Sequence, residues 1–461
     1  MSLFDNSYAR LPERFYTKLA PMPVREPILR AWNEDLAAKM GLPDWEDDEK
    51  ARIFGGNTVP DGADPLAALY AGHQFGSWNP QLGDGRAILL GEVTSGAHRF
   101  DIQLKGSGPT PYSRMGDGRN WVGPALREYL VSEAMHALGI PTTRALALVT
   151  TGETVVRERP LPGAVVTRVA SSHIRVGTFQ VFAARQDEDA LATLLDHVIA
   201  RHYPEATGPE EMLEAAVARQ AELVARWMAV GFIHGVMNTD NAHVAGETID
   251  YGPCAFMDGY SPSRVFSSID HGGRYAYSNQ ANIAAWNMAQ LATALLPLMP
   301  NRDAAIESFT EIVNGFAPAY QGALRRAFGA KIGLTEMDDD GAALVTSLLS
   351  MMVEKEEDFT NTFRALSDDP EFTLAHDDYA SWHEKWQEMS PDPTRMQATN
   401  PAIIPRNHLV EETIQSAVYD DFGPFLALHD ALRAPFTAPT ETRFTQPPKP
   451  GEEVTQTFCG T

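Results

Sequence analysis

The sequence lacks the features that define disulfide-rich, zinc-stapled and membrane-spanning proteins. Only two cysteines, Cys254 and Cys459, occur in 461 residues, which excludes a disulfide framework and a four-cysteine zinc site. No run of about eighteen apolar residues is present, so no transmembrane helix is expected. The first thirty residues lack the apolar core of a secretory signal. We therefore expect a cytoplasmic protein with no membrane partner.

Positive charge is also scarce. The formal net charge is −24, and an acidic chain is repelled by phosphate backbones, so we expect no nucleic-acid partner. The hydrophobic content of 44% and the charged content of 21% are those of a soluble globular protein. The length is sufficient for two or three packed regions. A local basic pocket is compatible with this overall acidity.

Hydrophobic periodicity predicts a β-rich first part. Alternating residues and turn signals indicate five strands, at 86–93, 99–105, 145–150, 153–158 and 164–170. The first two form a hairpin around 94–98. One amphipathic helix precedes Gly139 and Pro141, which end it. Short helices are expected near 27–40 and before Pro60.

The second part is predicted to be mainly helical, with amphipathic segments at 181–202, 209–232, 280–297, 303–328 and 341–368. A polar hairpin at 243–250 interrupts them, and the tail, rich in Pro and Thr, is expected to be extended. This outline is typical of an α+β, two-lobed, protein-kinase-like fold. It divides into an N-terminal extension (1–60), an N-lobe with an antiparallel sheet and one helix (61–170), a helical C-lobe holding the active-site loop (171–433) and a tail (434–461).

The segment HGVMNTDN, which begins at His234, resembles a kinase active-site loop without its usual acid. Val236 stands where kinases carry the catalytic Asp, whereas Asn241 and Asp250 have the spacing of the metal ligands. Asp240 is the nearest carboxylate and is our candidate general base, with a turn-capping aspartate as the alternative.

A second set of residues has the order that phosphate binding requires. Lys105 ends a strand on its polar face, and Glu128 follows on the helix, as in a Lys–Glu pair that grips phosphate oxygens. Arg168 lies in the fifth strand and Arg175 follows seven residues later, which suggests a local anion site. The alternatives are a surface lysine, a solvated glutamate and salt-bridged surface arginines.

Two glycine-rich motifs, Gly83-Asp84-Gly85-Arg86 and Gly116-Asp117-Gly118-Arg119, each pair Gly-Asp-Gly with an arginine. Glycines allow backbone N–H groups to approach phosphates closely. Ordinary turn chemistry is the alternative explanation.

Long motifs of the chain resemble the selenoprotein O family of protein-kinase-like pseudokinases. They include YAGHQFGSWNPQLGDGRA, QLKGSGPTPYSRMGDGR, SEAMHALGIPTTRALALVTTGE and HGVMNTDNAHVAGETIDYGPCAFMD. The resemblance implies that ATP binds in an orientation reversed relative to kinases. It also implies that AMP is transferred to Ser, Thr or Tyr hydroxyls of protein substrates, and that Mg²⁺ or Mn²⁺ is the cofactor. We expect a monomer, although the sequence leaves the oligomeric state open.

The resemblance also implies a role for each matching residue. Asp240 would be the proton acceptor, Asn241 and Asp250 the metal ligands, and Glu128 the residue that orients a lysine. The ATP-binding residues would be Gly83, Gly85, Arg86, Lys105, Asp117, Gly118, Arg168, Arg175 and Asp250.

This chain departs from the family pattern at its cysteines. Cys459 lies in the neighbourhood of the family's C-terminal selenocysteine, but the second family cysteine is absent from SPSRVFSSIDHGGRYAY. A redox link between this loop and the tail is therefore not expected, and Cys254 is interpreted as a small buried thiol. Two alternative functions stay open: a kinase that transfers the γ-phosphate, and an inactive ATP-binding scaffold.

Overall fold

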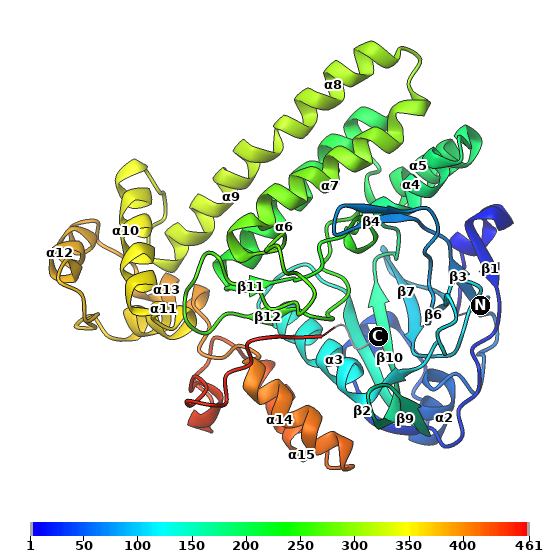
Figure 1. Ribbon diagram of the computed structural model, residues 1–461, viewed down its shortest axis with the longest axis horizontal. Helices are drawn as coiled ribbons and strands as arrows, with labels where there is room; N and C mark the ends of the chain where they lie inside the picture. The colour runs from blue at the N-terminus through cyan, green and yellow to red at the C-terminus, as the bar shows by residue number, and fades with distance from the viewer. Residues whose placement is uncertain (1–2, 459–461) are drawn as a thin grey trace.

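The computed structural model describes residues 3–458 and shows an α+β protein (Figure 1). Strands dominate the first third of the chain and helices the rest, as the periodicity predicts. Within the described residues, no helix combines the length and the apolar character that crossing a bilayer requires.

The main sheet is antiparallel and has eight strands, in the order β1-β3-β6-β7-β10-β9-β2, with β8 paired to β10. Their bounds are β1 Tyr16–Lys18, β2 Ile28–Trp32, β3 Leu66–Ala68, β6 Ala87–Ser95, β7 His98–Lys105, β8 Asn120–Trp121, β9 Arg144–Val156 and β10 Pro160–Ala170. Two small two-stranded sheets stand outside this sheet, the hairpin of β4 Gly72–Gln74 with β5 Ser77–Asn79, and the pair of β11 Phe232–Ile233 with β12 Ala255–Phe256.

Both faces of the sheet are covered by helices. Helix α3 (Val122–Ala137) packs through Leu126 and Leu130 against Leu148 and Val166. Helices α1 (Glu34–Met40) and α2 (Asp47–Phe54) share a core with residues of the opposite face, such as Val149. Because side chains alternate along a strand, neighbouring residues of β9 serve the two cores.

The helical part lies beside one end of the sheet (Figure 1). Its helices are α4 Val176–Ala184, α5 Glu188–His202, α6 Pro209–Ala229, α7 Gln280–Leu295, α8 Arg302–Asn314, α9 Phe316–Lys331, α10 Asp339–Lys355 and α11 Phe359–Asp368. Four more follow: α12 Tyr379–Glu388, α13 Pro393–Thr399, α14 Asn407–Val418 and α15 Gly423–Leu432. The last two helices, α14 and α15, pack against α3, so this late part of the chain returns to the helix that covers the sheet.

The structure corrects several predicted boundaries. Segments 181–202, 303–328 and 341–368 each contain two helices, separated near Gln186, at Gly315 and near Glu356. Gln186 and Glu356 have left-handed backbone angles, which end a helix whatever the hydrophobic pattern. The strands expected at 145–150 and 153–158 are one strand, β9, that continues through Gly152.

Two further predictions were wrong. Residues 28–32 form strand β2 at the edge of the sheet, so only the second half of the expected helix at 27–40 exists, as α1. The expected hairpin at 243–250 has turns but no strands; it lies in the long loop that joins the paired strands β11 and β12. In both segments, tertiary contacts override local propensity.

Candidate active site

A cleft of about 1080 Å³ opens between the sheet and the loops of the helical part. All the predicted site residues except Glu128 line it. They are Gly83, Gly85, Arg86, Lys105, Asp117, Gly118, Arg168, Arg175, Asp240, Asn241 and Asp250. Glu128 is in contact with two of them, Lys105 and Arg168. Residues from six separate segments thus meet at one site.

A buried ion-pair cluster forms the floor of the cleft. Glu128 on α3 accepts hydrogen bonds from Lys105 Nζ (2.7 Å) and from the guanidinium of Arg168. Asp250 Oδ1 lies 2.9 Å from Lys105 Nζ and 2.9 Å from Arg168 Nη2. Lys105, Glu128 and Arg168 are each at most 4% exposed. The interpretation of these residues as solvated surface charges is therefore wrong.

The sheet register explains why the two cations meet. Strands β7 and β10 pair so that Arg168 lies opposite Gln103 and Val166 opposite Lys105. Gln103 and Lys105 are two residues apart and share a face, so the side chain of Arg168 emerges beside Lys105. The polar face predicted for β7 is thus buried beneath the cleft and not solvated.

Asp250 is ionised in this setting. Burial raises the pKa of its carboxyl, but the charges of Lys105 and Arg168 outweigh burial and hold that pKa well below its usual value. The residue also has a left-handed backbone (φ 69°), which a non-glycine residue adopts at a cost. Strain of this kind is typical of side chains that are aimed at a site.

Arg175 lines another part of the cleft. Its guanidinium lies 4.4 Å from the centre of the Tyr70 ring and its Nη1 lies 3.4 Å from Asp84 Oδ1. Its Nε–H is buried and has no hydrogen-bond partner within residues 3–458. A buried guanidinium with an unused donor beside a cleft suits a bound anion.

Asp84 is a site residue that the sequence analysis missed. It is 2% exposed, and its Oδ2 accepts hydrogen bonds from the Ala68 N–H and from Gln103 Nε2, both at 3.1 Å. The carboxylate is therefore held in place and in turn fixes the guanidinium of Arg175. Asp84 lies inside the Gly83-Asp84-Gly85-Arg86 motif, but an aspartate beside glycines is also ordinary in a turn, so its residue type alone does not mark it.

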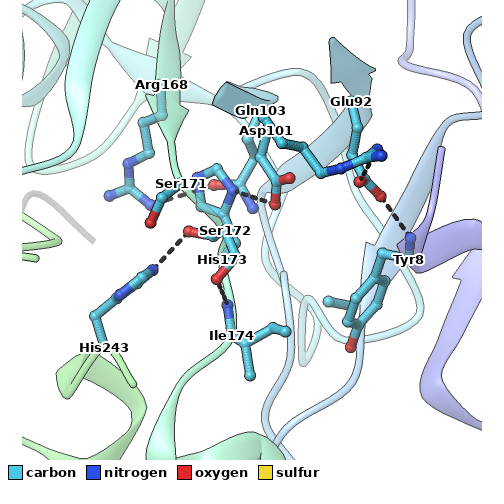
Figure 2. Close-up of polar contacts among 12 residues, drawn as sticks. Tyr8, Glu92, Asp101, Gln103, Arg168, Ser171, Ser172, His173, Ile174 and His243 are labelled. Atoms are coloured by element: carbon cyan, nitrogen blue, oxygen red, sulfur yellow. Dashed lines mark hydrogen bonds and ion pairs between the residues drawn. The ribbon is translucent and has the colours of Figure 1, made fainter. Parts of the chain in front are cut away.

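The connection from β10 to α4, residues 171–175, holds Arg168 and Arg175 in relation to one another. The Ser172 carbonyl accepts a hydrogen bond from His243 Nε2 (2.6 Å), and His173 Nδ1 lies 3.2 Å from Asp101 Oδ2, as Figure 2 shows. Burial lowers the pKa of both histidines, that of His243 to about 3. The connection is therefore held by two neutral imidazoles, and also by Arg201, whose Nε donates to the Ser171 carbonyl at 2.7 Å.

The loop after β11 presents the remaining residues. His234 is buried, and its Nε2 lies 2.9 Å from the Ile249 carbonyl, so it has a structural role in the loop. Asn241 donates through Nδ2 to the Val236 carbonyl at 3.0 Å. That hydrogen bond leaves the amide oxygen of Asn241 for a partner in the cleft.

Asp240 is 8% exposed, and its Oδ2 accepts a hydrogen bond from Gln74 Nε2 at 2.9 Å. The other oxygen, Oδ1, is buried and receives no hydrogen bond from another described residue. Burial raises the pKa of Asp240 to about 6, against the opposing effect of Gln74. The side chain caps no helix or turn through a hydrogen bond to another described residue, so the geometry favours a carboxylate that is ready to take a proton.

The two glycine motifs make close backbone approaches. A Cβ at Gly83 (φ 120°) would lie 2.6 Å from the Tyr112 ring. A Cβ at Gly118 (φ 65°) would lie about 2.2 Å from the backbone of Gly108. Asp117 forms a salt bridge with Arg157 (2.8 Å) at the rim. The glycines are therefore required by the packing of the loops that line the cleft.

The residues present suit a magnesium or manganese ion. Asn241 and Asp250 both line the cleft and offer one neutral and one anionic oxygen ligand. Such ions commonly take only one or two ligands from the protein and the rest from phosphate and water. No group of three or more His, Cys, Asp or Glu side chains with metal-binding geometry exists among the described residues. A metal at this site would therefore depend on the phosphates of a nucleotide.

Cys254 is 1% exposed and unpaired, as the sequence predicts. Burial raises the pKa of its thiol to about 12, so the reactive thiolate is suppressed. Cys459 lies outside the described residues.

Comparisons with known proteins identify the family of the chain. A family model described as "Protein adenylyltransferase SelO" matches residues 2–433. A protein of Jannaschia sp. (strain CCS1) named "Protein nucleotidyltransferase YdiU" is 60% identical over 476 residues, covering 99% of both chains. Proteins of the same name from Ruegeria pomeroyi and Rhizobium meliloti are 58% and 54% identical, again with 99% of both chains covered.

Proposed function

The chain belongs to the SelO family of protein adenylyltransferases, and we propose that it transfers AMP from ATP to Ser, Thr or Tyr hydroxyls of other proteins. The observation that carries the proposal is a single cleft lined by three cations, Lys105, Arg168 and Arg175, and by the carboxylate of Asp240. Nucleotidyl transfer requires these two elements, cations for the phosphates and a base for the acceptor hydroxyl.

The buried cations bind the triphosphate in this proposal. Lys105 and Arg168 are already held in place by Glu128, so they need little reorganisation when phosphates arrive. Arg175 offers its unused donor, and Arg86 lies at the same cleft. The glycine loops around Gly83, Gly85 and Gly118, together with Asp117, shape the nucleotide pocket.

Asp240 is the general base of the proposed reaction. The acceptor oxygen attacks the α-phosphorus, a new oxygen–phosphorus bond forms, and the bond to the bridging oxygen of pyrophosphate breaks. The hydroxyl proton passes to Asp240, and pyrophosphate leaves with the electron pair of the broken bond. The Asp240 carboxylate lines the cleft and is the available proton acceptor.

Asn241 and Asp250 would hold a Mg²⁺ or Mn²⁺ ion. When bound, such an ion neutralises phosphate charge and orients the triphosphate. Asp250 is suited to this role because it stays ionised beside the two cations.

The reversed nucleotide accounts for Val236. In our proposal the α-phosphate faces Asp240, and the two outer phosphates contact the guanidinium groups. The position that supplies the base in a kinase is then not beside the reacting phosphorus. Val236 is 3% exposed and packs as an apolar residue, and the proposed reaction needs no carboxylate at this position.

The wider proposal is a two-lobed, kinase-like monomer that works in the cytoplasm and binds no nucleic acid. Its N-lobe spans 61–170 and its helical C-lobe 171–433, with the extension 1–60 and the tail 434–461 added. The antiparallel sheet, α3 and the cleft between sheet and helices support the division into two lobes, and the extension adds β1 and β2 to the sheet.

Labelled ATP distinguishes the proposal from its two alternatives. ATP labelled at the α-phosphorus should transfer label to protein, and intact mass should show a gain of one adenylyl group. A kinase would transfer the γ-label and add one phosphate, and an inactive scaffold would transfer neither. Asp250→Ala should abolish labelling; full labelling by this variant would refute the metal assignment.

A further inference from the structure

The short hairpin β4–β5, residues 72–79, lies against the loop that carries Asp240. The His73 N–H donates to Thr239 Oγ1 (2.7 Å), and the Phe75 N–H donates to Asn238 Oδ1 (3.0 Å). With the bond from Gln74 to Asp240, three consecutive hairpin residues bind three consecutive loop residues. The hairpin therefore holds the loop in place through three hydrogen bonds.

The hairpin is built to approach Asp240 closely. A Cβ at Gly72 would lie 2.9 Å from Asp240 Oδ1, so only glycine permits this distance. The turn has left-handed angles at Phe75 (φ 50°) and at Gly76 (φ 82°). A phenylalanine adopts such angles at a cost, which is offset here by its N–H bond to Asn238 and its ring contact with Tyr275 at 5.0 Å.

The amide of Gln74 is held in one orientation. Its Oε1 accepts a hydrogen bond from Asn79 Nδ2 at 3.1 Å, which directs its Nε2 toward Asp240. Nε2 is also the only side-chain donor to the Asp240 carboxylate among the described residues. The hairpin is anchored to the helical part through His73, whose ring lies 5.3 Å from that of Trp286.

We propose that Gln74 is a positioning residue: it holds the Asp240 carboxylate in the orientation in which this group receives the proton of the acceptor hydroxyl. The inference rests on the proposed function, because it assigns the orientation of the base in that reaction. Gln74 contributes to the rate and not to ATP binding, since the cations that hold the phosphates lie on other segments.

The test compares Gln74→Met with the wild-type protein. Methionine has nearly the same size but cannot donate a hydrogen bond. We expect kcat for adenylyl transfer to fall about ten- to a hundredfold, the range for a hydrogen bond to a charged group. The KM for ATP should change less than about twofold, because a loss of orientation without a loss of binding appears in kcat alone.

Two other variants complete the experiment. Gln74→Glu should lower kcat at least as far, because it places a second carboxylate against Asp240. Ser77→Ala, an exposed position of the same hairpin, should keep the wild-type kcat. Thermal unfolding of each variant shows that the folded state is retained, and Gln74→Glu supplies the answer if the methionine variant does not fold.

The outcomes separate the inference from the proposed function. Wild-type kcat in Gln74→Met or in Gln74→Glu would overturn the inference alone, as would a raised KM with an unchanged kcat. A wild-type protein that transfers no adenylyl group would refute the proposed function, and the inference with it.

Discussion

Glu128 should be a costly carboxylate to remove from this protein. It is 2% exposed and is bound by two buried cations, Lys105 and Arg168. Without it, both cations would share Asp250 alone. Removing one partner of a buried ion pair costs about 3–5 kcal/mol, because a buried charge is left uncompensated. We expect Glu128→Ala to lose at least this much of its free energy of unfolding.

The assay is urea unfolding at neutral pH with a matched control. Glu222 also pairs with two arginines, Arg226 at 3.0 Å and Arg326 at 2.8 Å, but its side chain is 39% exposed. Glu222→Ala should therefore cost less than about 1 kcal/mol. Glu128→Gln, which keeps the shape and one acceptor, should fall between the two. A loss below about 1 kcal/mol for Glu128→Ala would refute the assignment of a buried cluster.

Three other predictions concern a loop, a lysine and a thiol. Gly118→Ala should destabilise the protein by more than the roughly 1 kcal/mol expected for a left-handed alanine. Gly96→Ala is its control, because Gly96 (φ 59°) has open space around its Cβ position; equal losses in chemical unfolding would contradict the backbone clash. Lys331 lies over the Phe363 ring (4.2 Å), and burial lowers its pKa from 10.5 to about 7. Between these pH values the unfolded chain binds more protons, so stability should rise with pH by up to about 1.4 kcal/mol per unit relative to Lys331→Met; parallel pH profiles of the two proteins would oppose this. The Cys254 thiol should resist iodoacetamide in the native protein at pH 8 and react after unfolding, as peptide mass mapping can show; rapid native alkylation would contradict its burial.

Much of the fold follows from local pattern. Hydrophobic alternation in 99–105 predicts β7, and the apolar stripe with its terminators predicts α3, because both elements bury one regular face. The edge strand β2 and the breaks near Gln186 and Glu356 could not be predicted in this way. Their conformation depends on partners distant in the sequence or on single left-handed residues.

The candidate site, like the fold, was only partly predictable from the sequence. Residue type and order predict that Lys105, Glu128 and Asp250 act together, and the structure brings all three into contact. Asp84 and Gln74 could not be identified, because each acts by fixing another side chain. Such a supporting role depends on a distance across the fold, for which a single sequence has no periodic signal.

The most direct test of the central claim is a crystal structure of the protein with a non-hydrolysable ATP analogue and Mg²⁺. We predict that the α-phosphorus lies nearest to Asp240, that the outer phosphates contact Arg168 and Arg175, and that the metal contacts Asn241 and Asp250. A nucleotide with its adenine deep in the cleft and its γ-phosphorus outermost would contradict the account.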